Sequence, residues 1–356
     1  MIAMQSMKAL RLLDWKSDPQ IVEVDRPVPG PGEALVRIGG AGACHSDLHL
    51  MHEFEGGVLP WGPPFTLGHE NAGWVEELGP DTEAAGISVG SAVAVYGPWG
   101  CGRCAKCLAG VETYCEHPEL APVPGGGGGL GADGGMAEYM LVPAVRQLVP
   151  LPDGLDPAHA APLTDAALTP YHAVKRSWAK LPPDAWAVVI GVGGLGHMAV
   201  QILKATTSAR IIAVDTREEA RAMALEMGAD AAVVPGDSAA EEIKTMTGGP
   251  GADVVLDFVG VDATLALSAA VVRVLGDLTI VGIGGGSYPL SFFSIPYEAS
   301  VQTTYWGSRP ELAEVLLLAA RGLITPTVST FDLDDAPRVY EDLAAGKIDG
   351  RAVIVP

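Results

Sequence analysis

The sequence has few positively charged and few aromatic residues. Lys and Arg number 22 against 43 Asp and Glu, so the formal net charge is −21. A surface this acidic repels nucleic acid and anionic membranes, which excludes a nucleic-acid-binding protein. Aromatic residues make up 6% of the chain and hydrophobic residues 48%. That balance is typical of a globular protein rich in small aliphatic side chains.

No uninterrupted apolar run is long enough to cross a membrane. The most apolar stretch, residues 187–203, is broken by glycines and by His197. The N-terminus lacks the basic start and the long apolar run of a signal peptide. Cysteines number five, and four of them cluster as thiolate ligands do. We therefore expect a cytoplasmic protein that does not act at a membrane.

The clustered cysteines, Cys101, Cys104, Cys107 and Cys115, fall within fifteen residues. Two-residue gaps between cysteines suit one tetrahedral ion, with thiolate ligands at about 2.3 Å. The alternative is a disulfide pair, but three cysteines this close cannot all reach bridge geometry with one another. The spacing predicts a closed structural zinc site in a lobe over about residues 97–117.

A chain of 356 residues exceeds the size at which one core keeps growing, so two domains are expected. The first part contains short strand patterns separated by Pro and Gly turns, whereas strands alternate with helices from Ala187 onward. The strands predicted are 8–13, 21–24, 33–38, 71–77, 91–96, 187–190, 210–214, 231–234, 252–258, 278–281 and 351–355. The helices predicted are 195–205, 217–227, 239–247, 263–275 and 310–322, and a further helix is expected to start near Cys44 or Ser46. This order indicates a mostly β domain built from both chain ends and interrupted by a doubly wound parallel α/β domain.

A glycine-rich turn follows the strand predicted at 187–190. Gly191, Gly193 and Gly196 occupy the positions of the dinucleotide-binding fingerprint, with Gly194 and Leu195 between the second and third. The first glycine permits a tight turn, the second lets the backbone approach a pyrophosphate, and the third lets helix and strand pack closely. The following helix then presents unpaired N–H groups to the phosphates.

An acidic residue, Asp215, ends the next predicted strand, nineteen residues after Gly196. At this place a carboxylate accepts hydrogen bonds from the adenosine ribose, which favours NAD. Arg217 is a complication, because it could attract the 2′-phosphate of NADP; the carboxylate of Asp215 would repel that phosphate. The alternative for Asp215 is a helix cap.

The fifth cysteine, Cys44, belongs to a different group of residues. His69 and Glu70 follow it by about twenty-five residues. Cys and His are good zinc ligands and Glu can also coordinate zinc. A lone Cys is more often a small buried hydrophobe, and the spacing does not show that these residues meet.

The motifs A-C-H-S-D, L-G-H-E, the four-cysteine lobe, G-V-G-G-L-G and D-G-R-A-V occur in this order over nearly the whole chain. Together they resemble the zinc-dependent medium-chain dehydrogenase/reductase family. The segments P-L-T-D-A-A-L-T-P-Y-H-A and P-Y-E-A-S-V-Q-T-T-Y-W-G are most similar to its bacterial NAD-dependent secondary alcohol dehydrogenases. The resemblance implies a Rossmann domain with a mostly β, GroES-like catalytic domain.

The resemblance also implies a catalytic zinc held by Cys44, His69 and Asp165, with Glu70 near the metal. Asp165 stands where the liver-type enzymes have Cys, and an oxygen ligand makes zinc a harder, stronger Lewis acid. Without the other two ligands, Asp165 would be interpreted as a helix N-cap for residues 166–174. The family pattern assigns Ser46 to the zinc-bound oxygen.

Three further residues take cofactor-related roles from the resemblance. His49 matches the histidine that ends a proton relay through the nicotinamide ribose, although many secondary alcohol dehydrogenases have an apolar residue there. His45 matches a group near the cofactor pyrophosphate. Arg351 matches a terminal arginine that reaches the cofactor phosphates.

An aromatic-walled substrate pocket is implied as well, suited to hydrophobic or aryl alkyl alcohols and ketones. Its predicted lining residues are Phe54, Phe293 and Trp306, each of which could equally be core. Bacterial relatives are commonly tetramers of paired dimers, so we expect a homo-oligomer, a tetramer or a dimer.

The predicted protein is therefore an NAD-dependent zinc alcohol dehydrogenase with two Zn²⁺ per subunit, one catalytic and one structural. The catalytic domain covers residues 1–166 and 305–356, and the Rossmann domain covers 167–304. One alternative is a polyol or amino alcohol dehydrogenase of the same superfamily, which would keep Glu as third ligand. Another is a zinc-free dinucleotide-binding reductase, which would have no use for Cys44, His69 and Asp165.

Overall fold

The computed structural model describes residues 5–83 and 86–356. The first predicted domain also contains residues 1–4 and 84–85, which lie outside the described residues. The chain divides into two compact units. The first contains Met1–Leu168, Gly307–Ala320 and Pro326–Pro356, and the second contains Thr169–Trp306 and Arg321–Thr325.

The first unit is built around a sheet in the order β10-β6-β5-β3-β18-β17, with β9 also paired to β3, and a smaller sheet in the order β2-β1-β4. The C-terminal strand β18 lies between β3 and β17, so the end of the chain completes the sheet that the first half begins. The strands are β1 (Ser6–Leu12), β2 (Gln20–Asp25), β3 (Ala34–Ala43), β4 (Phe65–Thr66), β5 (Glu70–Leu78), β6 (Ala92–Val95), β7 (Gly127–Gly128), β8 (Gly131–Ala132), β9 (Tyr139–Val142), β10 (Leu148–Pro150), β17 (Val328–Asp332) and β18 (Arg351–Val355).

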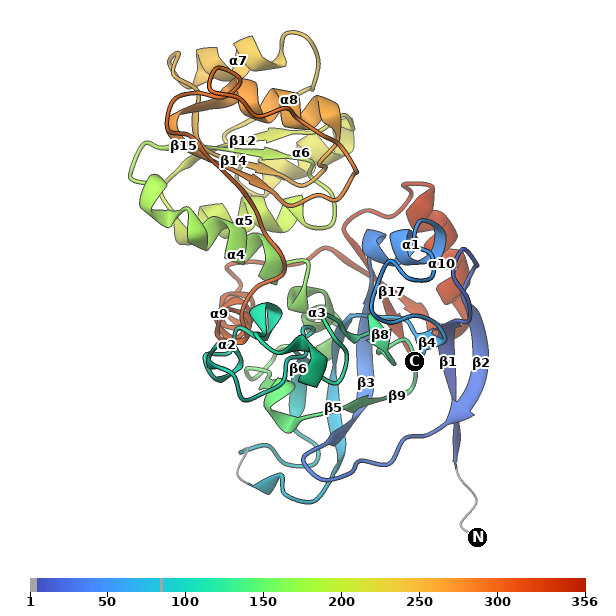
Figure 1. The fold of residues 1–356 in the computed structure, drawn as a ribbon. Coiled ribbons are helices and arrows are strands. Elements are labelled where there is room, and N and C mark those ends of the chain that lie inside the picture. Colours follow the sequence, from blue (N-terminus) through green and yellow to red (C-terminus); the bar gives the residue numbers. More distant parts are fainter. Residues whose placement is uncertain (1–4, 84–85) are drawn as a thin grey trace. The chain divides into compact units, whose positions relative to one another are not determined.

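Most helical segments of the first unit are short. In α10 the residues Ala336, Val339, Tyr340 and Leu343 are buried, at the spacing of one helical face. This face joins the core cluster of the unit, and α10 packs against α1 (Figure 1). The helical segments are α1 (His45–His52), α2 (Ala105–Leu108), η2 (Glu112–Tyr114), η3 (Pro118–Leu120), η4 (Val145–Gln147), α3 (Pro157–Ala160), η5 (Ala161–Thr164), α9 (Arg309–Ala320), η7 (Leu333–Asp335) and α10 (Ala336–Ala344).

The second unit is a parallel sheet in the order β13-β12-β11-β14-β15-β16. The central strand β11 pairs Val188 with Ile212 on one side and with Val255 on the other. Residues of these strands are buried on both faces, as a covered parallel sheet requires. Helices α7 and α8 cover one face and α5 covers the other (Figure 1). The elements are α4 (Leu168–Arg176), η6 (Trp178–Lys180), β11 (Trp186–Ile190), α5 (Gly196–Thr206), β12 (Arg210–Val214), α6 (Glu218–Glu226), β13 (Ala231–Val233), α7 (Ala239–Met246), β14 (Ala252–Asp257), α8 (Asp262–Val271), β15 (Val272–Ile280) and β16 (Ser300–Thr303).

The predicted fold class, a doubly wound parallel sheet together with a mostly β domain, is confirmed. Some elements differ in extent. The strand predicted over 33–38 continues to Ala43. The helix predicted over 263–275 ends at Val271, and β15 begins at Val272 instead of at residue 278. The β-branched residues of this segment favour a strand. Helical periodicity misses that change because α8 and β15 follow each other without a loop.

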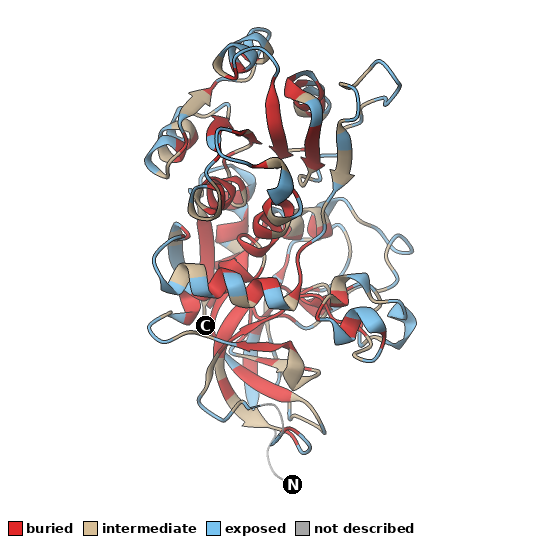
Figure 2. Cartoon of the chain, turned by 90° about the vertical axis from the view of Figure 1, so that its left-hand side faces the viewer, coloured by how far each residue is buried: buried red, intermediate tan, exposed pale blue. Residues whose placement is uncertain are grey.

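Burial follows the sheets in both units (Figure 2). Strands are largely buried, whereas the outer faces of the helices are exposed. Each unit has its own apolar cluster: the first gathers around β3, β5, β18 and α10, and the second around β11, β12 and β14. No helix among residues 5–83 and 86–356 is long and apolar enough to cross a membrane.

Candidate active site and metal centres

Cys44, His69, Glu70 and Asp165 come together in the first unit, and we call them the mixed cluster. One ligand atom from each residue lies within 4.8 Å of every other. His69 and Glu70 are buried, Cys44 is 6% exposed, and the side chain of Asp165 is 14% exposed. The four side chains are therefore close enough together to bind one metal ion.

The ends of neighbouring strands position the mixed cluster. Cys44 stands between the end of β3 and the start of α1, and Glu70 begins β5, which pairs with β3. Gly42 on β3 lies opposite Glu70, and a Cβ there would lie 2.0 Å from Glu70 Oε2. A glycine at this position therefore leaves the space that the buried carboxylate occupies. Asp165 follows η5, and α4 begins three residues later, so Asp165 does not directly precede that helix as an N-cap would.

The two ring nitrogens of His69 contact different groups. Its Nδ1 lies 3.0 Å from Asp47 Oδ1, and its Nε2 lies 3.2 Å from Ser46 Oγ and 3.7 Å from Asp165 Oδ2. Burial lowers the pKa of His69, but the charge of Asp47 and hydrogen bonds with Asp165, Asp47 and Cys44 outweigh it and raise the pKa well above its ordinary value. A carboxylate on Nδ1 is the arrangement that turns the Nε2 lone pair toward a metal.

Glu70 pairs with Arg351, whose Nη2 donates to Glu70 Oε1. Burial raises the pKa of Glu70 to about 7, against the lowering effect of the Arg351 charge. Arg351 was predicted to reach cofactor phosphates; its guanidinium instead contacts Glu70, and the residue is 4% exposed. The phosphate contact stays a prediction.

The mixed cluster fits zinc. Its donors are a thiol sulfur, an imidazole nitrogen and carboxylate oxygens, all of which zinc takes. Four such ligands around one ion lie roughly 3.3 to 3.8 Å apart. The four ligand atoms here lie within 4.8 Å of one another, so small side-chain shifts would bring them onto one ion. The buried Glu70 Oε2 has no hydrogen-bond partner among the described residues. A cation would satisfy such an oxygen.

Cys101, Cys104, Cys107 and Cys115, the four-cysteine cluster, also bring their sulfurs within 4.8 Å of one another. The Sγ atoms of Cys101 and Cys107 are 3.9 Å apart, far beyond a disulfide bond and near the roughly 3.8 Å of two thiolates on one zinc. The N–H of Cys107 donates to Cys104 Sγ at 3.5 Å and lowers the pKa of Cys104 to about 6. This geometry fits a tetrahedral zinc.

The glycine-rich turn joins β11 to α5 in the second unit. Gly191 has a φ of 85°, which favours glycine, and a Cβ on Gly196 would lie 1.8 Å from Gly191 O. A Cβ on Gly193 would meet nothing within 4 Å, so open space lies where the fingerprint expects a pyrophosphate. Gly194 and Leu195 complete the turn, and Leu195 immediately precedes α5.

Asp215 follows the end of β12 and faces this turn. Its Oδ2 accepts the N–H of Val192 at 2.8 Å, and its Oδ1 accepts the N–H of Arg217 at 2.9 Å. The carboxylate therefore ties the glycine-rich turn to the neighbouring strand. The Arg217 Nε lies 3.6 Å from the same carboxylate, which partly neutralises it.

The remaining predicted residues are dispersed. His45 is exposed at the start of α1, and His49 Nδ1 lies 2.8 Å from Glu53 Oε2. Phe54 packs with Trp15 at a ring distance of 6.4 Å. In the second unit, Phe293 is 84% exposed and Trp306 is 6% exposed. Their assignment to a substrate pocket stays a prediction.

Two residues were missed as parts of the site, Asp47 and Tyr340. The carboxylate of Asp47 accepts the backbone N–H of Cys44 and lies 3.0 Å from the ring of His69. The signal was present, because an acid three residues after a helix start commonly bonds back to the first N–H. Tyr340 had no local signal that linked it to residues almost three hundred positions earlier.

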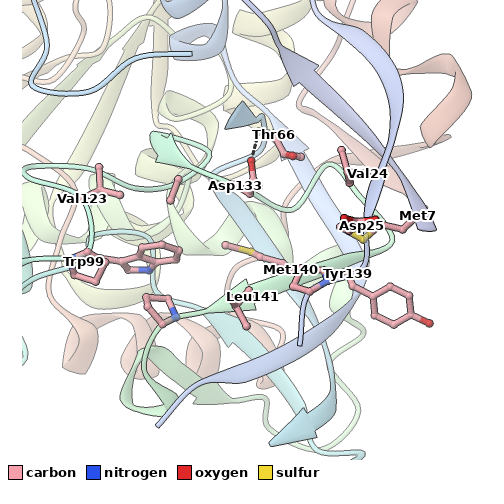
Figure 3. Close-up of a pocket in the computed structure, with 15 residues that line it drawn as sticks. Met7, Val24, Asp25, Thr66, Trp99, Val123, Asp133, Tyr139, Met140 and Leu141 are labelled. Atoms are coloured by element: carbon pink, nitrogen blue, oxygen red, sulfur yellow. Dashed lines mark hydrogen bonds between the residues drawn. The ribbon is translucent and has the colours of Figure 1, made fainter. Parts of the chain in front are cut away.

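A separate hollow of about 350 Å³ lies on the first unit (Figure 3). Its wall is largely apolar, with Asp25 and Asp133 as its acids, and Asp133 accepts the N–H of Thr66. None of its lining residues belongs to the mixed cluster or the four-cysteine cluster. It therefore takes no part in the site described above.

Comparison with known proteins gives two family matches. The model of the alcohol dehydrogenase GroES-like domain matches residues 30–153, and that of the zinc-binding dehydrogenases matches residues 194–321. The first match spans Cys44, His69 and the four cysteines. The second begins inside the glycine-rich turn.

Relatives match over the full length. An alcohol dehydrogenase of Geobacillus stearothermophilus is 36% identical, covering 98% of both chains. An NAD-dependent alcohol dehydrogenase of Sulfurisphaera tokodaii is 36% identical over 98% of this chain and 100% of its own. A D-arabinose 1-dehydrogenase (NADP(+)) of Saccharolobus solfataricus is 34% identical over 100% of this chain and 99% of its own.

Solved structures are also similar to this chain over nearly its full length. The alcohol dehydrogenase of Aeropyrum pernix has a TM-score of 0.88 at 37% identity, covering 98% of this chain and 100% of its own. The acetophenone reductase of Geotrichum candidum, solved with NAD, has a TM-score of 0.84 at 31% identity, covering 99% of this chain and 97% of its own.

Proposed function

This chain belongs to the zinc-dependent medium-chain dehydrogenase/reductase family, and from that membership we propose that it transfers hydride between NAD(H) and secondary alcohols or ketones. The observation that carries the proposal is the mixed cluster. Its four ligand atoms lie within 4.8 Å of one another in a largely buried site. We assign the catalytic zinc to Cys44, His69 and Asp165, and a structural zinc to the four-cysteine cluster.

A zinc ion held by Cys44, His69 and Asp165 would supply Lewis-acid polarisation of the substrate oxygen, and bound NAD would supply the hydride acceptor or donor. The chain's residues orient the substrate and move its proton. Ser46 Oγ, 3.2 Å from His69 Nε2, lies beside the ligands and can accept the alcohol proton. His49, paired with the exposed Glu53, is placed to pass a proton to water.

NAD binds the second unit in this proposal. The N–H groups at the start of α5 receive the pyrophosphate, and Gly193 leaves room for it. Asp215 favours NAD over NADP because its carboxylate repels a 2′-phosphate. Arg217 weakens this preference, since its Nε lies 3.6 Å from that carboxylate.

Hydrophobic secondary alcohols and aryl ketones are the proposed substrates. The similarity to an acetophenone reductase supports this class. The second candidate is an aldose or polyol, which the similarity to a D-arabinose 1-dehydrogenase favours. Asp165 in place of Glu as third ligand argues for the first class.

A homo-oligomer is part of the proposal. Strand β16 stands at the end of its sheet order, and an open strand edge invites pairing with another chain. Nearby in sequence, Phe292 is 73% exposed and Phe293 is 84% exposed. We also place the protein in the cytoplasm, because its cysteines are free thiols arranged as ligands.

The test combines metal content with activity in the wild type and in Asp165→Ala. We expect about two zinc ions per wild-type subunit and NADH formation on 1-phenylethanol, with little on D-arabinose. The variant should lose about one zinc and its activity. Asp156→Ala is the matched control, because that carboxylate accepts the N–H of Ala158 as a helix cap and should keep both zinc ions. Full activity in Asp165→Ala would return Asp165 to a structural role.

A further inference from the structure

Asp47 is a buried carboxylate that is not part of the mixed cluster. It is 0% exposed, and a buried charge is costly unless donors surround it. Its Oδ2 accepts the backbone N–H of Cys44 at 3.0 Å, and its Oδ1 lies 3.0 Å from His69 Nδ1. One side chain therefore touches the backbone of one proposed zinc ligand and the ring of another.

The third contact of Asp47 comes from the other end of the chain. Tyr340 on α10 donates its phenol O–H to Asp47 Oδ2 at 2.7 Å. Its ring lies on the buried face of α10 and is 3% exposed. A tyrosine in such a core needs a partner for its O–H, and Met136 Sδ, the other neighbour at 3.2 Å, is a weak acceptor.

Tyr340 stays protonated in this position. Burial raises the pKa of Tyr340 well above its ordinary value, and the charge of Asp47 raises it further. A protonated phenol is a fixed donor, so it holds Asp47 Oδ2 in place while Asp47 Oδ1 contacts His69. Helix α10 carries it there by packing against α1, which contains Asp47.

We propose that Tyr340 is a positioning residue for the mixed cluster, which its O–H organises through Asp47. The inference rests on the proposed function, since it takes the mixed cluster as the catalytic zinc site. With the O–H in place, Asp47 keeps Nδ1 of His69 engaged and aims Nε2 at the metal. Without it, the carboxylate is free to rotate, and both Cys44 and His69 lose part of their support.

The test is the rate at which zinc leaves the holoenzyme of Tyr340→Phe. This change removes the O–H and keeps the ring. Excess 4-(2-pyridylazo)resorcinol captures zinc as it is released, so the time course shows one kinetic phase for each site. The phase that is missing in Asp165→Ala is the release of zinc from the mixed cluster. Partners behind a metal ligand typically change metal affinity by 10–100-fold. We expect this phase to accelerate about tenfold, with the four-cysteine phase unchanged.

Tyr96→Phe is the matched control. Tyr96 is also buried, and its O–H donates to Gly307 O at 2.6 Å, so its loss removes a comparable hydrogen bond elsewhere in the same unit. Its O–H also lies 3.1 Å from Thr113 Oγ1 in the loop of the four-cysteine cluster, so the control is judged on the mixed-cluster phase, which should stay unchanged. An unchanged mixed-cluster phase in Tyr340→Phe, or an equal acceleration in Tyr96→Phe, would overturn the inference. Either result would show that Tyr340 contributes only to the packing of the core.

Asp47→Asn provides a second route if Tyr340→Phe folds poorly. It should accelerate the same phase, and Tyr340→Phe should add less than about twofold in that background, because both changes break one connection. Full additivity would contradict the inference. A wild type that never shows the mixed-cluster phase would instead overturn the proposed zinc site, and this inference with it.

Discussion

Gly193 and Gly196 are glycines for two different reasons within one turn. A Cβ on Gly196 would lie 1.8 Å from Gly191 O, so the residue is needed for the chain to pack. A Cβ on Gly193 would meet nothing within 4 Å. In the proposed function, the pyrophosphate of NAD would occupy that open space. The same fingerprint would then combine one folding constraint with one proposed binding constraint.

The two alanine substitutions should therefore have different effects on NAD binding and on stability. Gly193→Ala should raise the KM for NAD by about tenfold, roughly 1.4 kcal/mol, with little change in melting temperature. Gly196→Ala should lower the melting temperature by several degrees because of backbone overlap. Differential scanning calorimetry and initial-rate kinetics measure the pair. Equal loss of stability in both variants would argue against the binding role of Gly193.

Among the elements, the loop that carries the four cysteines shows how short segments build a closed site. Helix α2 is a single turn whose N-cap, Cys104, accepts the N–H of Cys107 through its sulfur. A Cβ on Gly100 would lie 2.5 Å from Cys107 Sγ, so glycine admits that sulfur to the cluster. Regular structure is sparse in this loop, and metal ligation can supply the missing stability.

Cys107→Ser should remove the structural zinc. A hydroxyl is a poor zinc ligand, and Cys107 is 2% exposed, so water cannot easily replace it. We expect zinc content to fall by about one per subunit and the melting temperature to fall by about 10 °C, the effect of roughly 3 kcal/mol in a unit of this size. Cys44→Ser is the control, and it should lose the other zinc. Unchanged zinc content in Cys107→Ser would contradict the assignment.

The β16 edge and the aromatic residues before it allow a test of assembly. Phe292 and Phe293 stack edge to face at 4.9 Å, and Phe292 also contacts Tyr297 at 5.6 Å. Exposed apolar residues that cluster mark protein interfaces. Replacing both phenylalanines with Glu should lower the mass measured by light scattering and leave the circular dichroism unchanged. Leu108→Glu, equally exposed at 73%, is the matched control. An unchanged mass in the double variant would remove this surface from the assembly.

Across the full chain, the net charge of −21 sets how stability responds to salt. Mutual repulsion among acidic residues destabilises the compact state, and salt screens it, since the Debye length falls from about 10 Å at 0.1 M to about 3 Å at 1 M. We expect the melting temperature to rise by several degrees between these NaCl concentrations. A melting temperature that falls with salt would show that ion pairs outweigh repulsion.

Much of the architecture was predictable because its signals are local. The alternation of strands and helices after residue 187 indicates a parallel sheet, and β12 and β18 begin and end where the pattern placed them. The four-cysteine spacing and the glycine fingerprint are equally local, because each site is made mostly by one short segment. Helix α10 and strands β9, β16 and β17 were not predicted. Tertiary contacts stabilise these elements: β9 pairs with the distant β3, β16 with β15 and β17 with β18, and α10 packs against α1.

The mixed cluster depended on information that the linear sequence does not contain. Spacing along the chain does not show that Cys44, His69 and Asp165 meet, since a distance in sequence is not a distance in space. Only the family resemblance assigned them as zinc ligands. The folded sheet places β3 beside β5 and brings their ends together. Tyr340 and Arg351 belong to the site for the same reason: β18 pairs with β3, and α10 packs on α1. Residue types and short spacings therefore specify which chemistry the chain can carry, while long-range strand pairing and helix packing select which side chains meet to perform it.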